Sequence, residues 1–468
     1  MGSRLGRDCG AAPAVSAFTR VTTLVEGFDA DAVALARLLA TEGRSVTVAG
    51  SGPATPEALA LRSLDVDVRE HADLDREPGE HDEAFLDVWT PEVAPRVALL
   101  RESGCIVRCL GDHVLERTPV PTIGVTGTAG KTTTVAFLAY LLRTAGSTVH
   151  TGTTARAGNL WPTAELLPPP ADGVVLMELT SSHLCFTTHS PTIAVITCFW
   201  PDHLELHGSL ERYRAAKEAI VRHQGPSDIV VANEDDDDAA AIASLSPGRR
   251  FGFSATREVD AGAFVRGAEM MLRDASGERS FVLPPSLDAP RLQALLAAAA
   301  TALAAGALPE TLRAPEPPPC RAALVGRLGD TELIDDGMAA TPAKTASALH
   351  EFPDASVVLV AGGELETAGL PVHASREERA LLEEACAEAR RVARFVVLFG
   401  PAAARLASSF DRRTTRRTTT LDEAIALASS HADGAKVLVV SPMFPLPLED
   451  RERIAPALRA LADDGNTT

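Results

Sequence analysis

Short apolar runs alternate with longer amphipathic stretches along most of the chain. The first repeat has an apolar run at residues 20–25, a helical pattern at 31–42 and a second apolar run at 45–49. A second repeat opens with an apolar run at 123–125, followed by a helical stretch at 132–145. Strand-length runs separated by helix-length segments are typical of βαβ units. The pattern therefore predicts an α/β protein built on parallel sheets.

The same alternation continues to the end of the chain and is interrupted once. Further strands are predicted at 173–179, 192–197, 228–232, 332–334, 356–361, 395–399 and 436–440, and an Ala-rich helix at 291–305. Between them, residues 307–320 read ALPETLRAPEPPPC. Proline stiffens such a segment and blocks regular structure, so an interdomain hinge is predicted there. The repetitive tract RRTTRRTTT at 412–420 is expected to be a surface loop.

Composition narrows the class of protein. A hydrophobic fraction of 46% and a charged fraction of 23% are ordinary for a folded protein. A length of 468 residues predicts two to four domains. The net charge of -19 makes nucleic acid and anionic membranes unlikely partners, because such a surface repels them. We expect no transmembrane helix, no signal peptide and, from seven scattered cysteines, reduced thiols in the cytoplasm.

A glycine-rich loop carries the strongest chemical pattern. The segment GVTGTAGKTTT, residues 124–134, stands between a predicted strand and a predicted helix. Glycines in this position let backbone N–H groups surround phosphate oxygens. Lys131 would then reach the β- and γ-phosphates, and the Thr132 hydroxyl would bind magnesium. The first glycine stands at 124 and Val occupies 125, so the spacing departs from the strict pattern, but the loop still predicts nucleotide binding.

Two further segments supply candidate metal ligands. Glu178, in MELTSSHL, follows an apolar run, and a carboxylate at the end of a strand is placed to bind magnesium. Residues 199–221, FWPDHLELHGSLERYRAAKEAIV, put Asp202 and His203 ahead of a helix that carries Lys217. Each residue alone is a weak indication of a site.

Taken together, the three segments are specific. TGTAGKTTT, MELTSS and PDHLELHGSLERYRAAK, in this order and spacing, resemble the Mur ligase family, and the resemblance covers nearly the whole chain after residue 20. It is closest to the branch that adds glutamate to a muramoyl-alanine nucleotide in peptidoglycan synthesis. The resemblance implies a Rossmann-like N-terminal domain at 1–117 for a UDP-sugar-type substrate. It further implies a central P-loop ATPase-type mononucleotide-binding domain at 118–318 and a Rossmann-like C-terminal domain at 319–468 for the amino acid.

The implied activity is that of an ATP-dependent, ADP-forming acid–amino-acid ligase. In the family, ATP converts a substrate carboxylate to an acyl phosphate, which the amine of an amino acid then attacks. The resemblance therefore implies ATP and two Mg²⁺ ions, and small-molecule substrates: a nucleotide-sugar or other carboxylate, and an amino acid. We expect a monomer in the cytoplasm.

The resemblance also assigns functions to single residues. It implies nucleotide binding by Gly127, Thr128, Gly130, Lys131, Thr132, Thr133, Arg321 and Asp336. It implies metal binding by Thr132, Glu178, His203 and Lys217, the last as a carbamylated lysine. The implied catalytic set is Lys131, Glu178, His203 and Lys217. Substrate contacts are implied for Asn159, Thr180, Ser181, Thr341 and Ser441.

Several recognition elements depart from the family pattern. Ala129 replaces an asparagine of the phosphate loop, and residues 288–295, DAPRLQAL, lack the His-Asn pair and second Asn that lie near adenine. In the first domain the glycine-rich turn is reduced to EGFDAD, and WTPE stands in place of a Ser-Pro-Gly turn. Phosphate and metal residues are thus kept while recognition residues differ. Three hypotheses remain open: a glutamate ligase for the D- or L-enantiomer, a ligase for another carboxylate and amino acid, and a non-catalytic paralogue.

Overall fold

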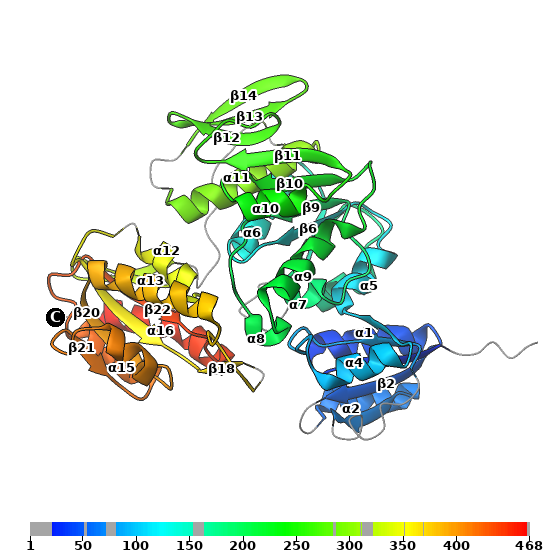
Figure 1. Ribbon diagram of the computed structural model, residues 1–468, viewed down its shortest axis with the longest axis horizontal. Helices are drawn as coiled ribbons and strands as arrows, with labels where there is room; N and C mark the ends of the chain where they lie inside the picture. Colours follow the sequence, from blue (N-terminus) through cyan, green and yellow to red (C-terminus); the bar gives the residue numbers. More distant parts are fainter. Residues whose placement is uncertain are drawn as a thin grey trace, which may run out of the picture.

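The computed structural model of the protein describes residues 21–50, 54–71, 81–152, 163–283, 287–308, 310, 322–350, 352–367 and 369–465. These residues form three α/β bodies, each built around its own sheet (Figure 1). The predicted fold class is therefore confirmed. None of the described helices is long and apolar enough to cross a membrane.

The first body is a parallel sheet flanked by helices, the arrangement of a Rossmann-like domain. Its five strands run in the order β3-β2-β1-β4-β5 and all pair in parallel. Asp29 ends the turn after β1 and caps α1 by accepting from the Ala32 N–H at 2.8 Å. The elements are β1 Thr22–Glu26, α1 Ala30–Thr41, β2 Ser45–Gly50, α2 Pro56–Ala60, the 3₁₀ helix η1 Leu61–Leu64, β3 Asp67–Glu70, β4 Glu83–Phe85, α4 Pro95–Glu102, β5 Ile106–Arg108 and α5 Leu110–Arg117.

The second body carries the glycine-rich loop after β6, the third strand from one edge of a nine-stranded sheet. The strand order is β14-β13-β12-β11-β10-β9-β6-β8-β7. Its elements are β6 Thr122–Thr126, α6 Lys131–Thr144, β7 Val149–Gly152, the 3₁₀ helix η2 Thr163–Leu166, β8 Val174–Glu178, α7 Ser181–Leu184, β9 Ile193–Ile196, α8 Leu204–His207, α9 Leu210–Arg222, β10 Ile229–Asn233, α10 Asp237–Ala243, β11 Arg249–Ser254, β12 Gly262–Arg266, β13 Glu269–Asp274, β14 Gly277–Val282 and α11 Ala289–Ala304.

One feature of this sheet differs from the sequence prediction. The strands β12, β13 and β14 pair antiparallel, so the sheet is mixed at this edge instead of fully parallel. The acidic run at 235–238 is largely exposed; Asp235 also accepts hydrogen bonds from Ser254 and Thr256, and Asp236 caps α10. A run of like charges in the sequence does not reveal these hydrogen bonds.

The third body is a second Rossmann-like sheet, in the order β15-β16-β22-β17-β20-β21. Its pairs are parallel except β15 with β16. The elements are β15 Ala323–Leu328, β16 Thr331–Asp335, α12 Pro342–Leu349, β17 Val357–Gly362, β18 Glu366–Thr367, β19 Leu370–Pro371, α13 Arg376–Val392, β20 Ala393–Phe399, α14 Ala403–Leu406, the 3₁₀ helix η3 Ala407–Ser409, β21 Thr415–Arg417, α15 Leu421–Ser429, β22 Val437–Met443 and α16 Leu448–Gly465.

The expectation that 412–420 is only a surface loop is wrong for its centre. Residues of β21 pair in parallel with β20 and form the exposed edge of the third sheet. Threonine is common in strands, and the backbone of these residues can hydrogen-bond to a neighbouring strand. The low-complexity pattern of the sequence gave no indication of this three-residue strand. The predicted domain divisions near 118 and 318 stay a prediction; the first falls between α5 and β6, and the second lies outside the described residues.

Candidate active site

All three bodies contribute to one pocket of about 430 Å³. A pocket of this size, shared between domains, is typical of a small-molecule site. The N-terminal body contributes Val88 and Trp89. The central body contributes Gly127, Thr128, Ala129, Gly130, Lys131, Thr132, Glu178, Thr180, Ser181, Ser182, Asp202, His203, Tyr213 and Lys217. The third body contributes Met338, Ala340, Lys344, Glu364, Glu366, Pro445, Leu446, Pro447 and Arg451.

The glycine-rich loop joins β6 to α6 and forms one side of the pocket. Gly127 has φ +145°, and a Cβ built on it would lie 1.9 Å from the Thr197 hydroxyl, so only glycine fits there. Gly130 has φ +79° and is the N-cap residue directly before α6, which begins at Lys131. The Lys131 ammonium donates to the Gly127 carbonyl at 2.9 Å. The backbone N–H groups at the start of α6 and this ammonium are groups suited to an anion.

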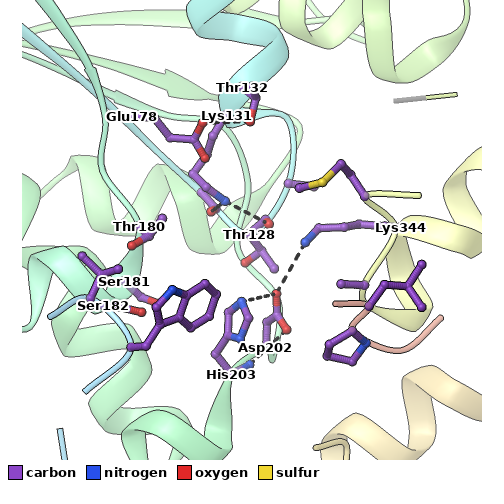
Figure 2. A pocket seen from close by; sticks show the side chains of 18 of the residues that line it. Thr128, Lys131, Thr132, Glu178, Thr180, Ser181, Ser182, Asp202, His203 and Lys344 are labelled. Carbon is purple, nitrogen blue, oxygen red and sulfur yellow. Dashed lines mark hydrogen bonds and ion pairs between the residues drawn. The ribbon is translucent and has the colours of Figure 1, made fainter. Parts of the chain in front are cut away.

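Thr132 and Glu178 form a pair of oxygen donors beside the loop. The Thr132 hydroxyl donates to the Glu178 carboxylate at 2.8 Å, and both residues are buried (Figure 2). Thr132 is held by α6 and Glu178 by the end of β8, the strand next to β6 in the sheet. Hydroxyl and carboxylate oxygens are the ligands that Mg²⁺ prefers. The donor set therefore fits a magnesium ion.

Asp202 connects the central and third bodies. Figure 2 shows it between His203 and Lys344, with Nε2 of His203 at 3.6 Å and the Lys344 ammonium at 3.9 Å. Burial would raise the pKa of Asp202, but His203 and Lys344 outweigh it and lower the pKa. Burial would likewise lower the pKa of His203, yet Asp202 and Glu205 raise it. The side chains thus form a charge network across the pocket.

Lys217 lies on α9, buried beneath the phosphate loop. It is 1% exposed, and its ammonium donates to the Gly127 carbonyl at 3.1 Å. Burial lowers the pKa of this lysine well below its usual range, and the nearby positive charge of Lys131 lowers it further. An uncharged amine is a nucleophile, so the structure favours the reactive form of this side chain.

Lysine is rare in this chain and concentrated in the pocket. The sequence contains four lysines and 40 arginines. Three of the four, Lys131, Lys217 and Lys344, line the pocket. Arginine supplies almost all the positive charge elsewhere. The pocket thus contains most of the chain's lysines, whose ammonium groups are compact and whose pKa changes readily on burial.

The structure brings together most of the residues that were predicted for the site. Ten of them line the pocket: Gly127, Thr128, Gly130, Lys131, Thr132, Glu178, Thr180, Ser181, His203 and Lys217. Thr133 follows the loop in α6 but does not line the pocket. Asn159 and Arg321 lie outside the described residues. Their predicted functions stay predictions.

Three predicted residues of the third body lie behind the pocket wall. The Ser441 hydroxyl is buried; it donates to the Asp336 carboxylate at 2.7 Å and lies 2.9 Å from the Thr345 hydroxyl. Thr341 begins α12 and is also buried. In this arrangement Asp336 and Ser441 bond each other, and neither they nor Thr341 line the pocket.

The third-body wall was largely missed from the sequence. Lys344, Glu364, Glu366 and Arg451 line the pocket, although none of them was among the residues predicted for the site. They come from α12, the loop after β17, β18 and α16. The one available sign was the scarcity of lysine, which makes Lys344 unusual.

Comparisons with known proteins agree with this geometry. The family model described as Mur ligase middle domain matches residues 125–279. A UDP-N-acetylmuramoylalanine–D-glutamate ligase from Symbiobacterium thermophilum is 31% identical over 382 residues, which cover 78% of this chain and 79% of the relative. One from Frankia casuarinae is 30% identical over 440 residues, covering 90% and 88%.

Solved structures have the same fold. The MurF ligase from Thermotoga maritima in complex with ADP has a TM-score of 0.60 at 17% identity, covering 95% of this chain and 98% of that one. A pseudomurein peptide ligase type C from Methanothermus fervidus has a TM-score of 0.58 at 17% identity, covering 94% and 100%. The chain therefore belongs to the Mur ligase family of ATP-dependent, ADP-forming ligases.

Proposed function

We propose that this protein joins D-glutamate to UDP-N-acetylmuramoyl-L-alanine in peptidoglycan precursor synthesis, as a monomer in the cytoplasm. The relatives that are 30% and 31% identical carry the name of that ligase. The observation that carries the proposal is the pocket itself, which joins a phosphate loop, a pair of magnesium-type ligands and a charged third-body wall. The alternatives that the experiment below separates are L-glutamate as the amino acid, and a different carboxylate with a different amino acid.

The chain's own residues would bind the phosphates and magnesium as follows. Thr132 and Glu178 would bind one magnesium ion, and His203 and a carbamylated Lys217 a second. Magnesium supplies positive charge that stabilises the transferring phosphoryl group. Lys131 would turn from the Gly127 carbonyl towards the phosphates, because an anion is a stronger partner for an ammonium than a carbonyl. The lowered pKa of Lys217 supports its carbamylation, since the uncharged amine is the form that reacts with CO₂.

The third-body wall has groups suited to both ends of an amino acid. Lys344 and Arg451 would bind its carboxylates. Glu364 and Glu366, on the same wall, would hold its ammonium group before the amine loses a proton and attacks the acyl phosphate. The attack forms the amide bond and releases phosphate. Holding the two reactants in one pocket replaces a bimolecular encounter with an oriented one.

The test is phosphate release from ATP with UDP-N-acetylmuramoyl-L-alanine and each glutamate enantiomer. We expect release with D-glutamate, and formation of the amide-linked product by mass spectrometry. Release with L-glutamate alone would reverse the proposed enantiomer. No release with either, together with release for another carboxylate and amino acid, would overturn the proposed substrates.

The shared mechanism has its own test. Lys131→Ala is expected to abolish phosphate release, because it removes the ammonium of the phosphate loop. Lys436→Ala is the matched control, since Lys436 is the one lysine that does not line the pocket and it is exposed. Unchanged turnover in Lys131→Ala would exclude this loop as the phosphate site.

A further inference from the structure

A second cluster of ligand-type side chains lies where the N-terminal body meets the central one. It contains Glu92 from the loop between β4 and α4, Cys185 directly after α7, and His207 at the end of α8. A carboxylate oxygen, a sulfur and an imidazole nitrogen from these residues lie within 4.8 Å of one another. Among the described residues, no other three His, Cys, Asp or Glu side chains are grouped in this way.

The three side chains retain capacity to bind a ligand. The Nδ1 atom of His207 lies 3.0 Å from the Glu92 carboxylate. His207 is 1% exposed, and within the described part of the chain its Nε2 atom is buried without a hydrogen-bond partner. Because Nδ1 faces the carboxylate, it is the nitrogen that could share a metal ion with Glu92, while the unpaired Nε2 lies on the other side of the ring. The Cys185 thiol makes only a weak hydrogen bond, to the Ser182 carbonyl at 3.3 Å.

We propose that Glu92, Cys185 and His207 bind a Zn²⁺ ion that links the N-terminal and central bodies. Sulfur, nitrogen and carboxylate oxygen are the ligands of zinc, whereas magnesium avoids sulfur. A thiolate and a carboxylate together neutralise the dication, so the complex would place no net charge in a largely buried site. Water would take the fourth position of a tetrahedral site.

The protonation states of the metal-free cluster set the chemistry of binding. Burial lowers the pKa of His207, although Glu92 opposes this, so the imidazole is neutral and able to bind a metal. Burial raises the pKa of Cys185 well above its usual range, so the free thiol is protonated. Zinc binding breaks the S–H bond and forms an S–Zn bond, and the proton passes to the buffer.

The position of the cluster gives the ion a structural consequence. The Glu92 N–H donates to the Leu206 carbonyl at 2.9 Å, so the two bodies already touch at this point. Trp89, three residues before Glu92, lines the pocket, and α8 begins directly after His203. A zinc ion here would hold the N-terminal wall of the pocket at a constant distance from His203. This inference does not depend on which substrate the pocket takes.

Cobalt substitution tests the proposal, because only a thiolate ligand produces a sulfur-to-cobalt charge-transfer band. Co²⁺ is added in excess Mg²⁺, which keeps the oxygen ligands of the pocket occupied. We expect one Co²⁺ per chain to develop the band, Cys185→Ser to lose it, and Cys386→Ser to keep it. Cys386 is the matched control, a buried free cysteine in the third body. Absence of the band in the unaltered protein, or its survival in Cys185→Ser, overturns the proposal.

A second variant keeps the test independent of folding defects in Cys185→Ser. Glu92→Gln can still bond to His207 but lacks the negative charge. We expect its zinc affinity, measured by competition with a chromophoric chelator, to fall by about tenfold or more. Zinc should also raise the midpoint of thermal unfolding of the unaltered protein and of Cys386→Ser. Equal zinc affinity of Glu92→Gln and the unaltered protein would count against Glu92 as a ligand and against the proposed site.

Discussion

Thr132 and Thr134 are two buried threonines of α6 with opposite hydrogen-bonding situations. The Thr132 hydroxyl bonds Glu178 at 2.8 Å, whereas the Thr134 hydroxyl has no partner among the described residues. Replacing each by valine keeps the shape and removes only the hydroxyl. The pair therefore separates a functional hydroxyl from a dispensable one.

Thr132→Val is expected to raise the magnesium concentration needed for half-maximal activity by about tenfold, the usual scale for loss of a group in a metal site. Thr134→Val should leave this concentration unchanged and should not lower stability, because it removes an unsatisfied buried polar atom. A magnesium titration of phosphate release measures both. Equal magnesium dependence of the two variants would exclude Thr132 as a ligand.

At the residue scale, the sequence predicted most reliably those positions where the backbone conformation requires a particular residue type. The glycines at 127 and 130 were expected to form a phosphate loop, and the structure shows φ values and a close approach to Thr197 that require glycine. The third-body residues Asp336 and Ser441 were expected to contact ligands, yet they bond each other behind the wall. Side-chain partners depend on packing between distant segments, so their assignment stays a prediction.

At the scale of elements, helix α1 meets the 3₁₀ helix η2 of the central body through one carboxylate. Asp31 accepts from the Ala164 N–H at 2.8 Å. Burial raises the pKa of Asp31 to about 6, and the neighbouring Asp29 and Asp87 act in the same direction. Ionised Asp31 is therefore unfavourable in the folded protein. Stability should fall as pH rises from about 4, the unfolded pKa, to about 6, because the folded state binds the proton more tightly.

Asp31→Asn is expected to remove this loss and to be more stable than the unaltered protein at neutral pH, by on the order of 2–3 kcal/mol. Its amide oxygen can still accept from Ala164. Asp82→Asn is a control of opposite sign, since hydrogen bonds from Thr22 lower the pKa of Asp82. Urea unfolding at pH 4.5 and 7.5 measures both. A difference between Asp31→Asn and the unaltered protein that does not change with pH would contradict the assignment.

At the scale of the whole molecule, the pocket exists because three bodies meet. Lys344 is contributed by α12 of the third body and lies 3.9 Å from Asp202 of the central body. We expect Lys344→Met to raise the KM for the amino acid by about tenfold, the effect of losing a charged hydrogen bond of about 1.5 kcal/mol. The KM for ATP should change little, because the phosphate loop is on another body.

Lys436→Met is the matched control, an exposed lysine of the third body outside the pocket. Steady-state kinetics with each substrate varied in turn measures the two KM values. If Lys344→Met altered only the KM for ATP, Lys344 would belong to the nucleotide side of the pocket, and the proposed amino-acid wall would be incorrect.

The sequence by itself determined the α/β class, the order of most strands and helices, and the glycine-rich loop between a strand and a helix. Each of these is encoded locally: apolar periodicity defines strands and helices, and the positive φ angles of the loop require glycines at two nearby positions, 127 and 130. The resemblance to the family could be recognised because three short segments occur in the family's order and spacing along the sequence.

Only the tertiary structure decided which side chains face one another. The pairing of Asp202 with Lys344, the wall formed by Glu364, Glu366 and Arg451, and the cluster of Glu92, Cys185 and His207 each join segments that are distant in sequence. Such contacts depend on how separate sheets dock, and no periodicity along one segment records the position of another. The edge strand β21 is another example, because its strand conformation depends on pairing with β20.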